Sequence, residues 1–451
     1  MNLIRRIRLI RPICRIGPIG PIMFQKGRVM TSPRDTATGW KIPGFVRSVI
    51  DRLRRAGHEA CIVGGAVRDL CMGRPATDWD VTTSATPAQI ASVFEGLRSF
   101  SLKHETTTLV HKGGHYEVTT FRGPKQTLED DLQHRDFTIN AMAYDLERSL
   151  VIDPWGGTKD IVRKVVRGVV SPEERFREDP LRLLRAVRFA AELGFRIDVR
   201  TSKAISSMAE AVTGAAPERI RDELVKTLVC EKPSRGLRLL KQTNLFGYIL
   251  PELGEVTKAQ GRVVDQTTPD ALLRLSALFC VPGRSASAAR VTQNGLTAKS
   301  VMIRLCFSKS MIRQVVGLVE EERALAAYGS SWQDGDLRRL VRRVGSENWD
   351  TLVRLRKANL TGPAKGNPEA LSLLTEVQAR VRRLIKTALV RGPQDLAING
   401  SDVMRITGLS PGPEVGRILK ELSEDLMDHP ERNKRTKLAA MVKKMNPQAL
   451  P

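Results

Sequence analysis

The distribution of apolar and polar positions divides the chain near residue 160. Between residues 40 and 155, short apolar runs and alternating stretches broken by glycine predict strands mixed with helices. After residue 160 the strand patterns fade, and Leu, Val and Ala recur at helical spacing to the end of the chain. We therefore predict an α+β protein, in which a mixed β-sheet with helices precedes an all-α remainder.

The N-terminal part has a definite predicted order of elements. The pattern indicates an amphipathic helix over residues 44–56, strands over residues 60–63 and 80–83, a helix starting at residues 86–88, and strands over residues 107–110 and 115–121. Pro87 suits the first turn of its helix, where a backbone amide hydrogen is not needed. Residues 231–390 are expected to be helical, with loops near Gly261, Gly283 and residues 363–367.

Charge and composition narrow the class of partner. The formal net charge of +24 and the isoelectric point near 10.2 favour a polyanion, nucleic acid first. Aromatic residues make up only 5% of the chain, which favours shape and phosphate contacts with structured RNA over recognition built mainly on base stacking. No apolar run approaches the length of a membrane-spanning helix, so we expect no membrane partner. Six scattered cysteines without a Cys-x-x-Cys pair indicate a reducing compartment.

Residues 1–40 differ from the rest of the chain. They contain eight Arg and Lys residues against one acid, Asp35, and a Gly-Pro-rich stretch that interrupts any long helix. We interpret them as a disordered basic leader outside the fold. The leader could be a mitochondrial transit peptide, or it could precede the true start at Met23 or Met30. The expected location is therefore cytoplasmic, with mitochondrial as the alternative.

A glycine turn follows the first predicted strand. Gly64 and Gly65 come directly after residues 60–63, and Arg68 lies three residues further on. Because glycine has no Cβ, the backbone can turn tightly there and approach a bound group closely. The amide-rich bend and the arginine together predict a cradle for a triphosphate.

A pair of carboxylates follows the glycine turn. Asp78 and Asp80 flank Trp79 at the start of the second predicted strand. Alternate residues of a strand point to the same face, so both carboxylates converge. Mg²⁺ binds few carboxylates and completes its shell with water and substrate phosphate. The spacing predicts a Mg²⁺ site of the kind used in phosphoryl or nucleotidyl transfer.

The ordered series of strand, Gly-Gly, Arg-Asp, spacer and Asp-x-Asp resembles the signature of class II tRNA nucleotidyltransferases and of the related bacterial poly(A) polymerases. The resemblance covers roughly residues 41–435. It implies a catalytic head over residues 41–157, a helical neck over 158–230, a helical body over 231–390 and a helical tRNA-binding tail over 391–451.

The resemblance also implies roles for further residues in the head. Glu117 lies in a stretch similar to the strand that carries a third acid in this family, and this favours it as a third carboxylate beside the metal; an edge-strand charge facing water is the alternative. Arg135 and Asp136 match a family motif that grips the sugar and selects ribose. His134 stands where that motif has another arginine.

Residues 171–188 are predicted to form one helix that selects the nucleotide. Its Asp179 and Arg182 match the family motif Glu-Asp-x-x-Arg. A carboxylate can accept from the exocyclic amine of cytosine or adenine while a guanidinium donates to the ring nitrogen. Uracil and guanine would leave these groups unpaired. Arg185 and Arg188 are candidates for contacts with the triphosphate or the base; an ordinary solvated ion-pair stripe is the alternative for the whole set.

The resemblance implies template-independent addition of C and A nucleotides to the 3′ end of tRNA, with CTP and ATP as substrates and Mg²⁺ as cofactor. Three alternatives stay open. The segment between Arg122 and Arg135 is shorter than the flexible loop of full CCA-adding members, which suits an enzyme that adds CC only. A bacterial poly(A) polymerase would share the head, and a non-catalytic RNA-binding protein would share the fold. The sequence does not define an oligomeric state.

Overall fold

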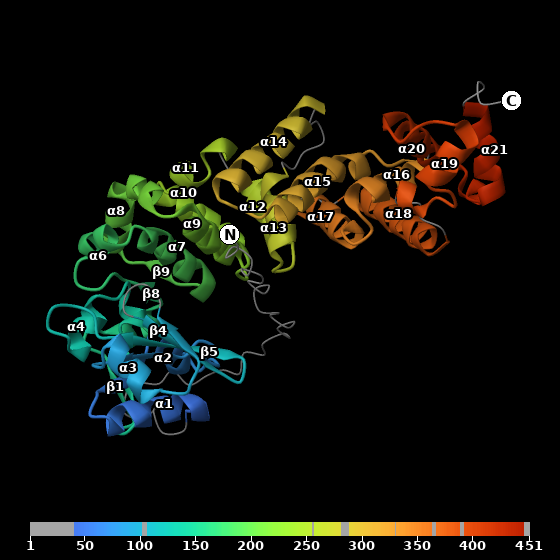
Figure 1. The fold of residues 1–451 in the computed structure, drawn as a ribbon. Helices are drawn as coiled ribbons and strands as arrows, with labels where there is room; N and C mark the ends of the chain where they lie inside the picture. The colour runs from blue at the N-terminus through green and yellow to red at the C-terminus, as the bar shows by residue number, and fades with distance from the viewer. Residues whose placement is uncertain are drawn as a thin grey trace.

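The computed structural model describes residues 40–101, 106–254, 257–280, 288–329, 331–362, 367–387 and 392–445. Apart from Trp40, the predicted leader lies outside these residues. The chain forms an elongated, curved series: a sheet with helices lies at one end, and helices follow one another to the tail at the opposite end (Figure 1). The predicted α+β class is confirmed. No helix in the described ranges is long and apolar enough to cross a membrane.

One mixed sheet forms the centre of the head. Its strands are β1 (Ala60–Val63), β2 (Asp80–Thr83), β3 (Ser99–Ser101), β4 (Thr106–His111), β5 (Gly114–Thr120), β6 (Ala143–Asp145) and β7 (Leu150–Ile152). Their order across the sheet is β3-β4-β5-β2-β1-β6-β7. Only β2 and β5 of these strands pair in parallel, and all the other neighbours are antiparallel. The strands predicted from the sequence are all present.

The two faces of the sheet have different coverings. One face packs under α1 (Gly44–Arg55) and α3 (Pro87–Val93) in a core that includes Ile50, Val81 and Val118. On the other face, Leu132 of α4 (Leu128–Gln133) packs against β1 and β6. Since side chains alternate along a strand, this second face also receives Asp80 and Glu117, the neighbours of Val81 and Val118. The helices α2 (Gly65–Cys71) and α5 (Gly157–Arg163) complete the head.

The predicted single helix over residues 171–188 is wrong. The structure has two helices there, α6 (Pro172–Glu178) and α7 (Leu181–Leu193). Asp179, between them, is extended with φ −148° and ψ 100°. Pro180 explains the break, because a residue before proline is disfavoured in the helical region and proline has no amide hydrogen to continue the ladder. A small parallel pair, β8 (Val165–Val166) and β9 (Arg196–Ile197), lies beside these helices.

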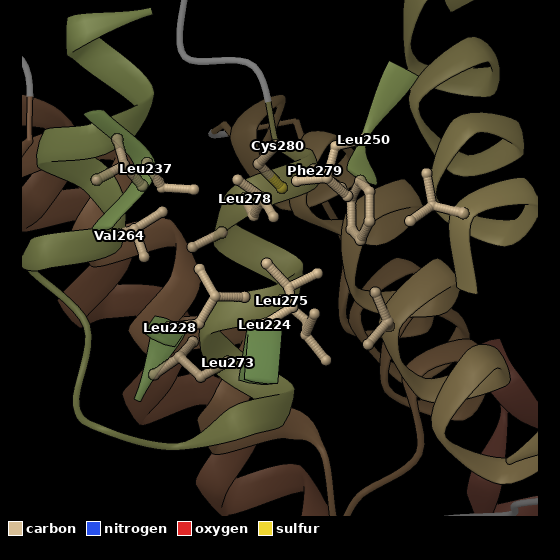
Figure 2. Packing of buried hydrophobic residues seen from close by; sticks show 14 of the residues in the cluster. Leu224, Leu228, Leu237, Leu250, Val264, Leu273, Leu275, Leu278, Phe279 and Cys280 are labelled. Atoms are coloured by element: carbon tan, nitrogen blue, oxygen red, sulfur yellow. The ribbon is translucent and has the colours of Figure 1, made fainter. Parts of the chain in front are cut away.

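The remainder is helical, as predicted, but the loop predicted near Gly261 is wrong, because Gly261 lies inside α12; the loop predicted near Gly283 and residues 363–366 of the third lie outside the described residues. Its α-helices are α8 (Val199–Ser207), α9 (Pro217–Leu228), α10 (Pro233–Gln242), α11 (Phe246–Ile249), α12 (Lys258–Asp265), α13 (Ala271–Phe279), α14 (Ala288–Arg304), α15 (Lys309–Ala326), α16 (Asp334–Val344), α17 (Trp349–Thr361), α18 (Pro368–Thr387), α19 (Gly400–Thr407), α20 (Pro413–Asp428) and α21 (Arg435–Met445). One buried apolar core runs from the head–neck junction through the neck and body. Figure 2 shows part of it, where leucines of α9 lie beside leucines of α13. The tail has a separate core built from α19, α20 and α21.

Candidate active site

The turn after β1 brings the backbone close to two charged side chains. Gly64 has φ +73°, a left-handed conformation that favours glycine. A Cβ on Gly64 would lie 3.1 Å from Nη1 of Arg135 and 3.6 Å from Oδ2 of Asp80. Gly65 begins α2 directly after this turn. The glycine turn therefore leaves room for a basic and an acidic group at the same edge of the sheet.

The parallel pairing of β2 with β5 brings Asp80 beside Glu117. Val81 pairs with Val118, so the residues that precede them lie next to each other on the opposite face. Burial raises the pKa of Asp80, and the Asp78 carboxylate adds to this while Arg135 opposes it. Burial also raises the pKa of Glu117, and both aspartates contribute. Asp78 itself is exposed just before β2. The three acids thus form one region of negative potential.

The acids suit a divalent cation whose shell is completed by other ligands. Among the residues described, no group of three or more His, Cys, Asp or Glu side chains is arranged to hold a metal ion by itself. Their mutual effect on pKa means that a bound cation would relieve repulsion between them. Oxygen donors of this kind fit a hard cation such as Mg²⁺, which keeps water and phosphate among its ligands.

Arginines concentrate on the neck side of these acids. Arg135 donates from Nε and Nη2 to Oδ2 of Asp131, at 3.3 and 3.0 Å. Asp131 is fully buried and also accepts from Thr82 Oγ1 and from the backbone amide of Arg122. Burial lowers the pKa of Arg122, and the Arg135 charge lowers it further. Such clustered guanidinium groups are suited to a polyphosphate.

Sequence reasoning missed Arg122, Asp131 and the helix that carries Asp131. The segment 123–134, interpreted from the sequence as a shortened loop, contains α4, and the Thr127 side chain accepts from Asp130 N at its start. An N-cap threonine, with Asp131 four residues before Arg135, was the available signal. Arg122, two residues beyond the end of β5, was visible as well, but no local pattern connected it to the acids.

Besides Arg135, the predicted nucleotide-binding residues Arg68, Asp136, Arg185 and Arg188 lie in buried or partly buried ion pairs. Arg68 is buried and donates to both carboxylate oxygens of Asp69 and to Oδ1 of Asn140. Asp136 is also buried and is held by Arg185, with an N–O distance of 2.6 Å. The Arg185 guanidinium is the leading opposite charge, and with the Asn140 hydrogen bond it keeps the pKa of Asp136 well below its usual range despite burial.

Arg188 lies further inside the neck. It donates to Glu223 of α9 at 2.6 Å and to Glu192 at 2.7 Å, and its guanidinium lies 3.8 Å from the centroid of the Phe189 ring. Glu223 is buried and also lies 3.9 Å from Arg185. These contacts join α7 to α9, and they place Arg188 among structural ion pairs.

Asp179 and Arg182 lie at the head–neck junction but do not pair with each other through their side chains. Both carboxylate oxygens of Asp179 accept from Arg219 of α9, at 3.2 and 2.8 Å. Arg182 donates to Glu178 at 2.7 Å and to the carbonyl oxygen of His134 at 2.9 Å. If a base bound between Asp179 and Arg182, its exocyclic amine would have to replace Arg219 as the donor to the Asp179 carboxylate.

Comparison with protein families agrees with this architecture. A family described as "Poly A polymerase head domain" matches residues 60–167. A second family, "Probable RNA and SrmB- binding site of polymerase A", matches residues 194–256. A third, tRNA nucleotidyltransferase domain 2, matches residues 287–442.

Full-length relatives decide the assignment. The CCA-adding enzyme of Geobacillus stearothermophilus is 32% identical over 416 residues, which cover 88% of this chain and 96% of the relative. The chain belongs to the class II CCA-adding enzyme family. Another family member, the CCA-adding enzyme of Anoxybacillus flavithermus, is 31% identical over 411 residues and covers 87% of this chain and 94% of its own.

Solved structures of CCA-adding enzymes share the fold. The crystal structure of the Bacillus stearothermophilus CCA-adding enzyme in complex with CTP matches with a TM-score of 0.69 and 29% identity, over 93% of this chain and 99% of that one. The Thermotoga maritima CCA-adding enzyme complexed with tRNA matches with a TM-score of 0.57 and 21% identity, over 92% and 98% of the two chains. The resemblance to class II tRNA nucleotidyltransferases is confirmed.

Proposed function

We propose that this enzyme adds C and A nucleotides to the 3′ end of tRNA, without a template, from CTP and ATP. The observation that carries the proposal is the pairing of β2 with β5, which sets Asp80 beside Glu117 next to the Gly64 turn and Arg135. Relatives of nearly full length are CCA-adding enzymes. The proposed location is the cytoplasm, with mitochondria as the alternative if residues 1–40 are a transit peptide.

The acids are proposed to serve as the metal site. The family implies use of a divalent metal, and we propose Mg²⁺ held by Asp78 and Asp80 with help from Glu117. A bound Mg²⁺ would neutralise triphosphate charge and lower the pKa of the attacking 3′-hydroxyl. Around it, the chain orients the two substrates and supplies positive charge for the departing pyrophosphate.

The nucleotide is proposed to lie between the glycine turn and the neck. The backbone amide of Gly65, with Arg135 and Arg122, would bind the triphosphate at the turn that Gly64 makes possible; the Gly64 amide itself donates to the carbonyl oxygen of Met142. Asp179 and Arg182 would bind the base edge after Arg219 releases Asp179. The buried pairs of Arg68, Asp136, Arg185 and Arg188 support a positioning role: they hold α2, the head–neck junction and α7 in place for those contacts.

Extension of defined tRNA transcripts tests the proposal. We would supply CTP and ATP, separately and together, to one tRNA lacking CCA and to one ending in CC, with Mg²⁺. Full extension of the first and addition of one A to the second are expected. The Asp80→Asn variant should lose at least about a thousandfold in kcat, a severe loss because a proposed metal ligand is removed. Asp51→Asn, an exposed carboxylate change on α1, serves as the matched control.

Other outcomes would select the alternatives. Arrest at CC, with the CC-ended tRNA unchanged, would identify a CC-adding enzyme, for which the short α4-containing segment is the favouring observation. Long A tails would identify a poly(A) polymerase. Retained RNA binding without extension would indicate a non-catalytic binding protein.

A further inference from the structure

A lateral row of side chains crosses the open face of the sheet. Phe100 of β3 pairs with Thr108 of β4, and Thr108 pairs with Glu117 of β5. Directly opposed residues in antiparallel strands project to the same face, and Asp80 follows Glu117 in the parallel pair. Phe100 therefore lies on the same face as the acids, at the edge strand of the sheet. With neighbouring strands about 4.8 Å apart, β3 lies about 10 Å from β5.

Phe100 is an exposed aromatic residue. The Phe100 side chain is 45% exposed, whereas most phenylalanines of the described chain are buried. Its ring meets the ring of His115 edge to face, with centroids 6.4 Å apart and planes at 80°. His115 is also exposed and lies two residues before Glu117, so it projects to the same face. The two rings form an aromatic shelf, defined here as Phe100 and His115.

Thr108, next to the shelf in β4, has a buried hydroxyl without a hydrogen-bond partner among the described residues. Thr108 is 3% exposed, and its Oγ1 has no hydrogen-bond partner among the described residues. It lies between Phe100 and Glu117 in the row. A buried hydroxyl costs free energy unless a bound group or water satisfies it. The Thr108 hydroxyl lies below the surface, and the exposed groups of this face are Phe100, His115 and Glu117.

The order of groups across this face distinguishes two sides. Gly64 and Arg135 lie on the β1 side of Asp80, Phe100 lies on the β4 side of Glu117, and His115 lies two residues before Glu117 in β5 itself. Nucleotidyl transfer proceeds with the attacking and leaving oxygens roughly in line across the phosphorus. If pyrophosphate leaves toward the arginines, the attacking 3′-hydroxyl must approach from the side of the shelf.

We propose that the shelf of Phe100 and His115 stacks a base at the 3′ end of the acceptor RNA, and so positions its terminal hydroxyl beside Asp80 and Glu117. This inference rests on the proposed function, because it identifies the acceptor side of the same site. Stacking on an aromatic face tolerates any base. A growing 3′ end that changes its last base at each addition needs that tolerance.

Kinetics of variants at the shelf test the inference. Phe100→Ala should lower kcat/KM for a tRNA lacking CCA by about five- to a hundredfold, the range of one lost base–aromatic stack. The KM for CTP should change less than about twofold, and Phe100→Trp should restore kcat/KM for tRNA. Leu150→Ala is the matched control, because Leu150 is an exposed apolar residue on the opposite edge strand, β7. Thermal unfolding of each variant checks that the fold is retained.

Photo-crosslinking gives a readout independent of turnover. A tRNA ending in 5-iodocytidine, bound to the wild-type enzyme, should crosslink to a peptide that contains Phe100 or His115. Three results would overturn the inference. Phe100→Ala could have the same kinetics as wild type, or it could raise the KM for CTP by as large a factor as it lowers kcat/KM for tRNA. The third is that crosslinks are confined to peptides without Phe100 or His115. If the wild-type enzyme fails to extend tRNA, the proposed function fails, and the crosslink position then decides the inference by itself.

Discussion

Asp136 and Arg185 show how single side chains fix the head to the neck. Asp136 is buried, and Arg185 of α7 donates to it from two nitrogen atoms. Replacing Asp136 by Asn would remove the nearest carboxylate partner of Arg185 and leave Glu223, 3.9 Å away. We expect a loss of about 2 to 4 kcal/mol in the free energy of unfolding at neutral pH, measured by urea denaturation. The exposed Asp51→Asn variant should be nearly neutral.

The same pair predicts the pH dependence of that loss. Because the folded-state pKa of Asp136 is lowered from 3.8, its stabilising contribution is fully present above 3.8 and disappears only as pH falls through the folded value. The difference between wild type and Asp136→Asn should therefore stay constant from about pH 8 to pH 5. A difference that already shrinks between pH 7 and 5 would contradict the assigned ion pair.

Val170 carries backbone strain immediately before α6. Its φ is +53°, a left-handed conformation that β-branched residues disfavour by about 1 to 2 kcal/mol, and its side chain is 46% exposed. We expect Val170→Gly to raise the stability by up to about 1 kcal/mol, because the strain relieved exceeds the entropy cost of glycine. Calorimetry should show a higher Tm. Val199→Gly, an exposed valine in α8, should lower it.

Among the elements, α4 positions the arginines of the site. Its Asp131 accepts from Thr82, from Arg135 and from the backbone of Arg122. Asp131→Asn should lower kcat/KM for CTP by about tenfold or more through misplacement of Arg135, with the KM for tRNA unchanged. Asp130→Asn is the matched control, because Asp130 is also buried but bonds to Lys125 N instead. Equal kinetic effects of the two variants would reject a positioning role for Asp131.

The crossing of α9 and α10 depends on a glycine. A Cβ on Gly236 would lie 2.3 Å from Cγ2 of Thr227. We expect Gly236→Ala to destabilise the protein by about 1 to 3 kcal/mol through overpacking. Thr227→Ser removes that methyl group and keeps the hydroxyl that donates to the Glu223 carbonyl. Gly236→Ala should therefore cost less in the Thr227→Ser background, as a double-mutant cycle would measure.

At the scale of helices and strands, the sequence predicted where the elements lie better than it predicted the side-chain contacts between them. Apolar periodicity located the strands around Gly64 and Asp80, because alternation and burial are local properties of a strand. The break at Asp179 was also a local signal, since Pro180 follows it, but helical spacing on both sides obscured it. The contacts of Arg68 with Asn140, of Arg188 with Glu223 and of Asp179 with Arg219 join distant segments. No local pattern of charges specifies such pairs, so the sequence could nominate these residues but not their contacts.

For the whole molecule, the +24 charge predicts salt-sensitive binding of tRNA. Lys437, Lys443 and Lys444 are exposed on α21, in the tail far from the sheet (Figure 1). Replacing all three by Gln should raise the KM for tRNA and reduce the slope of log KM against log salt by up to about three. The KM for CTP should not change. An unaltered slope, equal to that of the control Lys41→Gln, would show that this helix makes no phosphate contacts.

The parallel pairing of β2 and β5 limits where insertions and deletions can be tolerated in the evolution of this chain. One residue inserted within β5 before Glu117, with the preceding residues kept in register, would turn both the acid and the core valine to the wrong face, since side chains alternate with period two. The segment 123–134 between Arg122 and Arg135 lies outside every strand, so residues added there would leave the row of acids intact. Gains and losses of length should therefore accumulate in that segment, and a change in the nucleotides added could arise by lengthening it while the catalytic strands keep their register.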